Sequence, residues 1–145
     1  MRAGTRKPGN RATKATRATD AAVATRIVGW RLDPGDRAAL LARFPPRYSE
    51  TVADHVTHGR TGESPPRPEA ARATVIGHAD DGSGVEALVV ALDGDSARWN
   101  GSRYHVTWSL ADGREAKESN AVIATYGWTP VDYGPEVALE PAEWP

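Results

Sequence analysis

The stretch ARATVIGHADDGSGVEALVVALD, residues 71–93, predicts a β-hairpin and so largely decides the class of the fold. Its two halves, 71–80 and 84–93, have the composition of strands. The Asp-Gly-Ser-Gly segment that separates them is typical of a tight turn between antiparallel neighbours. We therefore expect a mostly antiparallel sheet.

Strand signals also occur on both sides of this hairpin. Segments rich in β-branched and aromatic residues predict further strands at 25–32, 50–58, 102–110 and 136–141. Residues 59–70 contain two glycines and three prolines, and we expect them to form a loop long enough to cover a cleft.

Two helices complete the predicted order. Asp33 followed by Pro34 is the arrangement of an N-cap and a first-turn proline, and Pro45 ends that helix. A shorter helix is expected within 111–127, with Ser119 or Asn120 as its N-cap and Gly127 as its C-cap. The order β-α-β-β-β-β-α-β predicts an α+β fold, a mostly antiparallel sheet with two helices.

Length and composition set the class of protein. With 145 residues the chain is long enough for one domain, which we expect to span 23–145. No apolar run approaches the roughly 20 residues of a membrane span, so no membrane association is expected. The chain has no cysteine, which excludes disulfides, thiolate catalysis and cysteine-ligated zinc and is compatible with a cytoplasmic location.

The net charge of −1 conceals a basic amino end. Residues 1–22 contain six basic residues and one acidic residue, so this tail carries +5 and the rest of the chain carries −6. The tail has no apolar periodicity and is predicted to be disordered. A solvated tail, an arm that attracts nucleic-acid phosphates and an organellar transit peptide are the three interpretations of it.

The tripeptide His-Val-Thr occurs twice, in DHVTHGR (54–60) and in YHVTWSL (104–110), although the chain has only four histidines. Side chains of a strand alternate between its faces, so His and Thr of each copy project together while Val56 and Val106 point into the core. Two such strands side by side would present two imidazoles and two hydroxyls to one cleft.

This set of groups suits the cleavage of a phosphodiester. A neutral imidazole can deprotonate an attacking water while a protonated one gives its proton to the leaving oxygen. The hydroxyls can hydrogen-bond the non-bridging phosphate oxygens. No metal and no cofactor is needed for these steps.

The paired motifs resemble those of the two-histidine (2H) phosphoesterases, and RYHVTWSLADGREAKESN is similar to the cyclic phosphodiesterase domains of fungal-type tRNA ligases and of compact bacterial RNA-repair proteins. The resemblance spans about residues 25–141. It implies a compact bilobal fold, catalytic roles for His55 and His105, and phosphate clamps at Thr57 and Thr107. The motifs lie 50 residues apart, which is short for the superfamily and implies a trimmed lobe.

Residues near the motifs add candidates and alternatives. Arg60 is a candidate for contacting phosphate, and Tyr126 is a candidate, with Trp99 and Trp128, for stacking on a base. His55 and His58 form an H-x-x-H pair, but positions i and i+3 of a strand face opposite sides, so we predict no metal site. We expect His78 to be a hydrogen-bonded residue of the sheet rather than a ligand.

The sequence predicts a metal-independent hydrolase of the cyclic phosphodiesterase type. Its expected substrate is a 2′,3′-cyclic phosphate or a related nucleotide or RNA end, which would place it in RNA repair or processing without a stable protein partner. The sequence leaves two alternatives open: a nucleotide- or RNA-binding module without turnover, and a structural or interaction domain.

Overall fold

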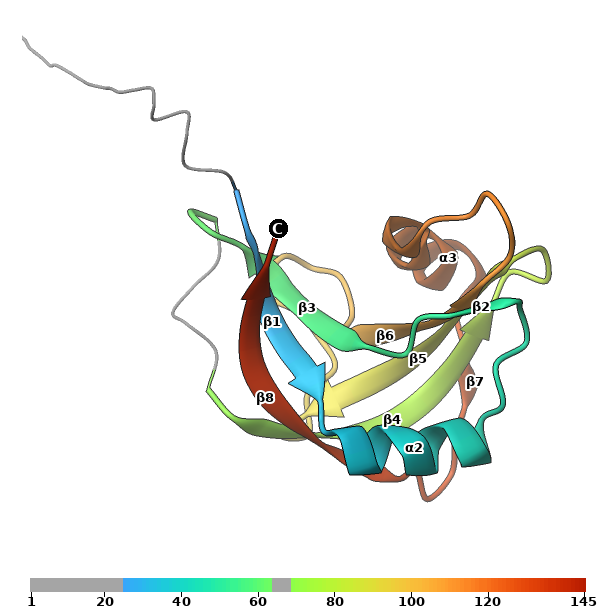
Figure 1. Cartoon of the computed structure of the whole chain (residues 1–145), viewed down its shortest axis with the longest axis horizontal. Helices are drawn as coiled ribbons and strands as arrows, with labels where there is room; N and C mark the ends of the chain where they lie inside the picture. Colours follow the sequence, from blue (N-terminus) through green and yellow to red (C-terminus); the bar gives the residue numbers. More distant parts are fainter. Residues whose placement is uncertain (1–24, 64–68) are drawn as a thin grey trace, which may run out of the picture.

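The computed structural model describes residues 25–63 and 69–145 (Figure 1). The predicted tail, 1–22, and the middle of the predicted loop at 59–70 lie outside the described residues. Neither α-helix in the described part of the chain is long and apolar enough to cross a membrane.

The described strands form one sheet in which every pairing is antiparallel. Along the sheet the order is β2-β6-β5-β4-β8-β1-β3, with β7 paired to β4. With its two α-helices, this sheet confirms the α+β class. The strands are β1 (Ile27–Leu32), β2 (Glu50–Thr51), β3 (His55–Arg60), β4 (Ala71–Asp80), β5 (Val85–Leu92), β6 (His105–Leu110), β7 (Thr129–Pro130) and β8 (Glu136–Trp144).

The two outermost strands of this order, β2 and β3, are consecutive parts of one segment, residues 50–60. β2 pairs with β6 and β3 pairs with β1, so the sheet bends round until its two edges meet in this segment. Ala53, between the two strands, has a positive φ of 45° and marks the change of partner. The two lobes expected from the resemblance are therefore not separate sheets in the described residues.

Capping residues define the ends of the two α-helices. α2 (Pro34–Arg43) opens with the Asp33 carboxylate accepting a hydrogen bond from the Asp36 N–H at 3.0 Å. α3 (Ser119–Tyr126) follows the short 3₁₀ helix η1 (Ala116–Glu118) and ends at Gly127, the predicted C-cap. The predicted N-cap of α3 is wrong, because Glu118 occupies that position and the Ser119 hydroxyl bonds elsewhere.

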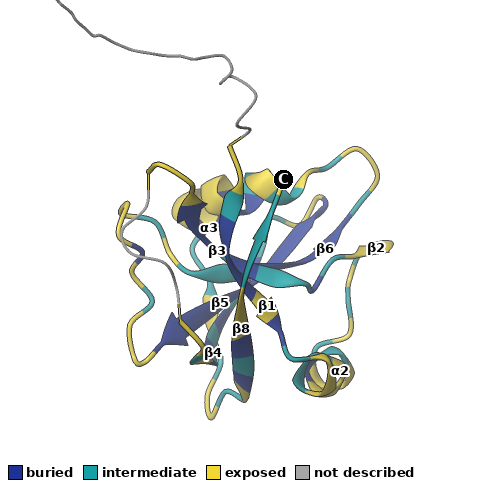
Figure 2. Cartoon of the chain, turned by 60° about the vertical axis from the view of Figure 1, so that its left-hand side comes forward, coloured by how far each residue is buried: buried dark blue, intermediate teal, exposed yellow. Residues whose placement is uncertain are grey.

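The main core fills the interior of the curved sheet. Trp30, Leu88, Val106, Trp108 and Leu139 belong to it and are at most 5% exposed. α2 covers one end and contributes Leu40, and α3 covers the outer face of the sheet, where Ile123 packs against Ala87 and Val89 of β5. β5 is therefore buried on both faces, as the blue strand in Figure 2 shows.

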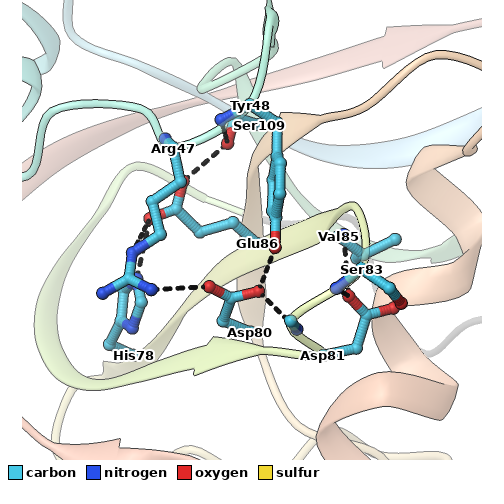
Figure 3. Close-up of polar contacts among 10 residues, drawn as sticks. Arg47, Tyr48, His78, Asp80, Asp81, Ser83, Val85, Glu86 and Ser109 are labelled. Carbon is cyan, nitrogen blue, oxygen red and sulfur yellow. Dashed lines mark hydrogen bonds and ion pairs between the residues drawn. The ribbon is translucent and has the colours of Figure 1, made fainter.

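One carboxylate is buried at the end of β5, and the structure satisfies it fully. Glu86 is 1% exposed and receives hydrogen bonds from the Ser109 hydroxyl at 2.6 Å and the Arg47 N–H at 3.0 Å, with His78 Nε2 at 2.7 Å (Figure 3). Burial alone would raise its pKa, but these bonds bring the pKa of Glu86 below its ordinary value. His78 is thus the hydrogen-bonded sheet residue that the sequence predicts.

We predict that Glu86→Gln lowers the free energy of unfolding by about 3 kcal/mol, because it removes one charge from a buried pair and leaves its partners without a full set of acceptors. Glu136→Gln is the control, since its ion pair with Arg72 is more than half exposed and should change stability by less than about 0.5 kcal/mol. Urea denaturation measures both. Equal effects in the two variants would contradict this account of Glu86.

Candidate functional site

The strands that carry the two His-Val-Thr tripeptides, β3 and β6, lie where the curved sheet meets itself. Backbone bonds join this seam only at its start, from Val52 N–H to the Trp108 carbonyl and from Ala53 N–H to the Thr107 carbonyl, each 3.0 Å. From His55 onward β3 pairs with β1 instead. The two tripeptides therefore flank a part of the seam where the two strands have separated.

Side chains bridge the separated part of the seam. The His58 carbonyl of β3 accepts hydrogen bonds from Arg98 Nη2 at 2.9 Å and from Trp99 Nε1 at 2.8 Å. The Tyr104 hydroxyl lies 3.3 Å from His58 Nδ1. Arg98 and Trp99 belong to the segment that leads into β6, so these contacts hold β3 beside β6 without a backbone ladder.

A cavity of about 310 Å³ opens between the two strands. Both histidines and both threonines of the repeated tripeptide line it. Val56 and Val106, the middle residues, point to the other face and are 0% and 1% exposed in the core. The remaining lining residues are Ile27, Gly59, Arg60, Glu63, Arg98, Asn100, Ala116, Lys117 and Asn120.

His105 is held in one orientation at the cavity wall. Its Nδ1 lies 3.0 Å from the Arg103 carbonyl, which can only accept, so Nδ1 carries the proton and Nε2 of the neutral ring keeps its lone pair. Burial lowers the pKa of His105, and the positive charges of Arg98 and His55 lower it further against the opposing effect of the carbonyl. The neutral imidazole is therefore favoured here.

His55 has acidic and aromatic neighbours instead. Its Nδ1 lies 3.2 Å from Asp54 Oδ2, which also pairs with Arg31. The indole of Trp144, on β8, packs against the imidazole with ring centroids 4.6 Å apart, and the Arg31 guanidinium lies 4.9 Å from the centroid of that indole. These contacts position the imidazole and leave its Nε2 without a hydrogen-bond partner among the described residues.

The two threonines differ in what their hydroxyls contact. Thr57 is half-buried, and its hydroxyl makes no hydrogen bond to the described residues. Thr107 is 5% exposed, lies 2.8 Å from the Ser119 hydroxyl and donates to the Ala116 carbonyl at 3.3 Å. The hydroxyl of Thr57 is thus available to a ligand, while that of Thr107 must first give up the long bond to Ala116.

The cavity is predominantly cationic. Arg98, Arg60 and Lys117 line it beside the two histidines, and Glu63 is the one carboxylate among the described lining residues, while Lys117 also pairs with Glu115 at 3.2 Å. Arg98 is 8% exposed, and no carboxylate of the residues described pairs with it. A nearly buried guanidinium that lacks a counter-ion, beside hydroxyl and imidazole groups, favours binding of an anion.

The structure brings five of the six site residues predicted from the sequence to this cavity: His55, His105, Thr57, Thr107 and Arg60. The sixth, Tyr126, lies on α3 outside the cavity with 66% of its surface exposed. His58 faces the core and packs edge-on against Trp30. Among residues 25–63 and 69–145 no three His, Asp or Glu side chains are arranged to hold a metal ion.

Sequence reasoning missed several residues of this region, and three of them matter most for the argument. Arg98 lies in a polar stretch that the sequence indicates only as a turn, and no pattern marks it as buried. Asn120 was expected only as a helix cap, and Trp144 lies beyond the predicted end of the last strand. Ser119 is likewise expected only as a helix cap, and its hydroxyl instead lies 2.8 Å from that of Thr107 and supports it.

No family model, no curated protein and no solved structure matches this chain. The function must therefore be inferred from the cavity itself.

We predict that Arg98→Gln raises the pKa of His105, because it removes a positive charge that disfavours the imidazolium. A titration of the His105 ring followed by NMR measures this pKa in both proteins. Arg72→Gln is the control, since Arg72 is exposed and pairs with Glu136 away from the cavity. An unchanged His105 titration in Arg98→Gln, with the fold intact, would show that the two groups do not interact.

Proposed function

We propose that this protein is a phosphodiesterase of the two-histidine type, which hydrolyses a 2′,3′-cyclic phosphate or a related nucleotide phosphodiester end. The observation that carries the proposal is the cavity between β3 and β6, lined by both copies of the His-x-Thr pair and by Arg98. This combination supplies two proton-transfer groups and several donors for a phosphate within one space.

We assign His105 as the general base. The Arg103 carbonyl fixes its Nδ1 proton, so Nε2 of the neutral ring is the atom that accepts a proton from water. Burial and the nearby positive charges lower the pKa of His105, so that the ring is neutral near pH 7. As the water oxygen bonds to phosphorus, its proton passes to His105 Nε2.

We assign His55 as the general acid. The Asp54 carboxylate near Nδ1 and the Trp144 indole against the ring hold it in place, so Nε2 is the ring nitrogen left to donate a proton. Its Nε2 proton goes to the O2′ or O3′ oxygen of the ribose as the bond between phosphorus and that oxygen breaks. The product is a phosphate monoester, and a proton transfer from His105 to His55 through solvent restores the starting state.

Cations and hydroxyls of the cavity stabilise the phosphate during this reaction. Arg98 is the principal candidate, because it is nearly buried and its charge lacks a carboxylate partner among the described residues. The Thr57 hydroxyl is available to a non-bridging oxygen, and Lys117 and Arg60 add positive charge at the rim. Such groups stabilise the charge that develops on the oxygens in the transition state.

The predicted substrate is small or the end of a chain. Residues 23–145 carry a net negative charge, whereas a groove for long RNA is normally positive along its length. The three basic side chains that could contact a phosphate here, Arg60, Arg98 and Lys117, line a cavity of about 310 Å³ rather than a long groove. We place the reaction in RNA repair or processing and in the cytoplasm, with which a chain free of cysteine is compatible.

We predict that the purified protein hydrolyses adenosine 2′,3′-cyclic monophosphate and that His55→Ala or His105→Ala each lowers the rate at least ~100-fold, the scale of lost acid–base catalysis. Chromatographic separation of substrate and monophosphate product measures the rate. Activity should persist in EDTA, because both proton transfers are assigned to side chains.

The control is Arg72→Gln, which changes an exposed residue of β4 that does not line the cavity and should leave the rate unchanged. Loss of activity on chelation would point to a metal enzyme instead. Binding of the nucleotide without any turnover would favour a binding module, and the absence of both would favour a structural domain.

We further predict that the rate falls on the acidic side as the pH drops through the pKa of His105, which lies below the ordinary value near 6.5. The sign follows from the role of a base, which is inactive once protonated. In Arg98→Gln the acidic limb of the pH–rate profile should move to higher pH, in addition to any loss of rate. If the acidic limb stays at the same pH in Arg98→Gln, His105 is not the general base.

A further inference from the structure

A second cavity, of about 330 Å³, adjoins the first one, and Asn120 lines both. Its volume is at the lower end of the range for small-molecule sites. It lies between the residue 101–103 turn and the second half of α3, and it is closed at the back by Trp128. The lining residues are Gly101, Ser102, Arg103, Asn120, Ile123, Ala124, Gly127 and Trp128.

The walls of this second cavity combine apolar surface with a guanidinium. Trp128 is half-buried against the cluster that contains Ile123. The Arg103 guanidinium lies 5.6 Å from the centroid of the Trp128 ring. Aromatic rings and arginine planes are the two surfaces on which proteins stack unpaired bases.

The indole is fixed in place before any ligand arrives. A Cβ atom on Gly77, in the middle of β4, would collide with the Trp128 ring, so the absence of a side chain at Gly77 lets the ring lie directly on the sheet. A rigid aromatic surface loses little conformational entropy when a ligand packs on it.

Asn120 provides a polar group where the two cavities meet. It is exposed on the first turn of α3, and its side-chain amide makes no hydrogen bond to other described residues. An amide offers both donors and an acceptor, which matches the mixed edge of a nucleobase.

We propose that this second cavity binds the base of the nucleotide whose phosphate occupies the first one. The inference rests on the proposed function and specifies its substrate, a nucleoside cyclic phosphate rather than a sugar phosphate without a base. Arg103 connects the two cavities directly, because its carbonyl orients His105 while its side chain lies over Trp128. One nucleotide therefore spans both cavities, with its ribose near Asn120.

The test compares two substrates that differ only in the base. One is adenosine 2′,3′-cyclic monophosphate, and the other is methyl riboside 2,3-cyclic phosphate, in which a methoxy group replaces the base. The native protein should prefer the adenosine compound by ~10-fold or more in kcat/KM, the scale of one stacked base.

The decisive variant is Ala124→Trp, which fills the cavity from an exposed position of α3. It should lower kcat/KM for the adenosine substrate ~10-fold or more, and it should change kcat/KM for the methyl riboside by less than about twofold. Thr125→Trp, at the next exposed position and outside both cavities, should change neither rate. Arg103→Met tests the same site without adding bulk. It should lower kcat/KM for the adenosine substrate and not for the methyl riboside.

The outcomes separate this inference from the proposed function. Equal turnover of the two substrates by the native protein, or equal losses for both in Ala124→Trp, would overturn the base site while leaving the phosphodiesterase intact. If neither substrate is hydrolysed, equilibrium binding of adenosine 3′-monophosphate tests whether the second cavity binds the base. Binding that Ala124→Trp weakens and Thr125→Trp does not would support the base site even without catalysis.

Discussion

The change of strand partner at Ala53 is the constraint on which the rest of the structure depends. One segment, residues 50–60, pairs first with β6 and then with β1, so it both closes the sheet and leaves it partly open. This change of partner requires a positive φ at Ala53, a strained conformation for a residue with a side chain, and Ala53 is fully buried. Beyond that point, β3 is held beside β6 by the Arg98 and Trp99 side chains on the His58 carbonyl. A buried carbonyl that has lost its ladder partner is thereby satisfied, and the space between the strands becomes the candidate site.

The alternation of a strand ties the core and the cavity together. Val56 and Val106 are buried in the interior, and the histidine and threonine beside each of them face outward into the cavity. Each tripeptide thus fixes the position of its polar groups by burying the residue between them. The two copies then acquire different environments from their neighbours. The Arg103 carbonyl and Arg98 lie near His105, whereas Asp54 and Trp144 lie near His55. Identical sequences consequently place their two imidazoles in different surroundings, and the neutral form is favoured at His105.

Local patterns in the sequence account for much of this molecule, and long-range contacts account for what they miss. The 71–93 hairpin, the start of α2 at Asp33 and the faces of the two tripeptides follow from turn chemistry, capping and alternation. The partner change at Ala53 does not, because nothing local in ETVADHVTH indicates a break. The burial of Arg98 depends on a carbonyl 40 residues away. Pro141 normally indicates the end or edge of a strand, yet β8 continues to Trp144 in pairing with β1 and so brings an indole to His55.

The way in which β3 is held has a consequence for motion. A regular ladder opens only by breaking several cooperative bonds, whereas the far part of this seam is closed by side chains, with Arg98 and Trp99 on the His58 carbonyl and the Tyr104 hydroxyl near His58 Nδ1. Because these bonds are made by side chains, they can break without unfolding either strand. Rotamer changes occur far faster than local unfolding. We therefore expect the mouth of the cavity to open more readily than the part of the sheet around β5, whose residues are all buried.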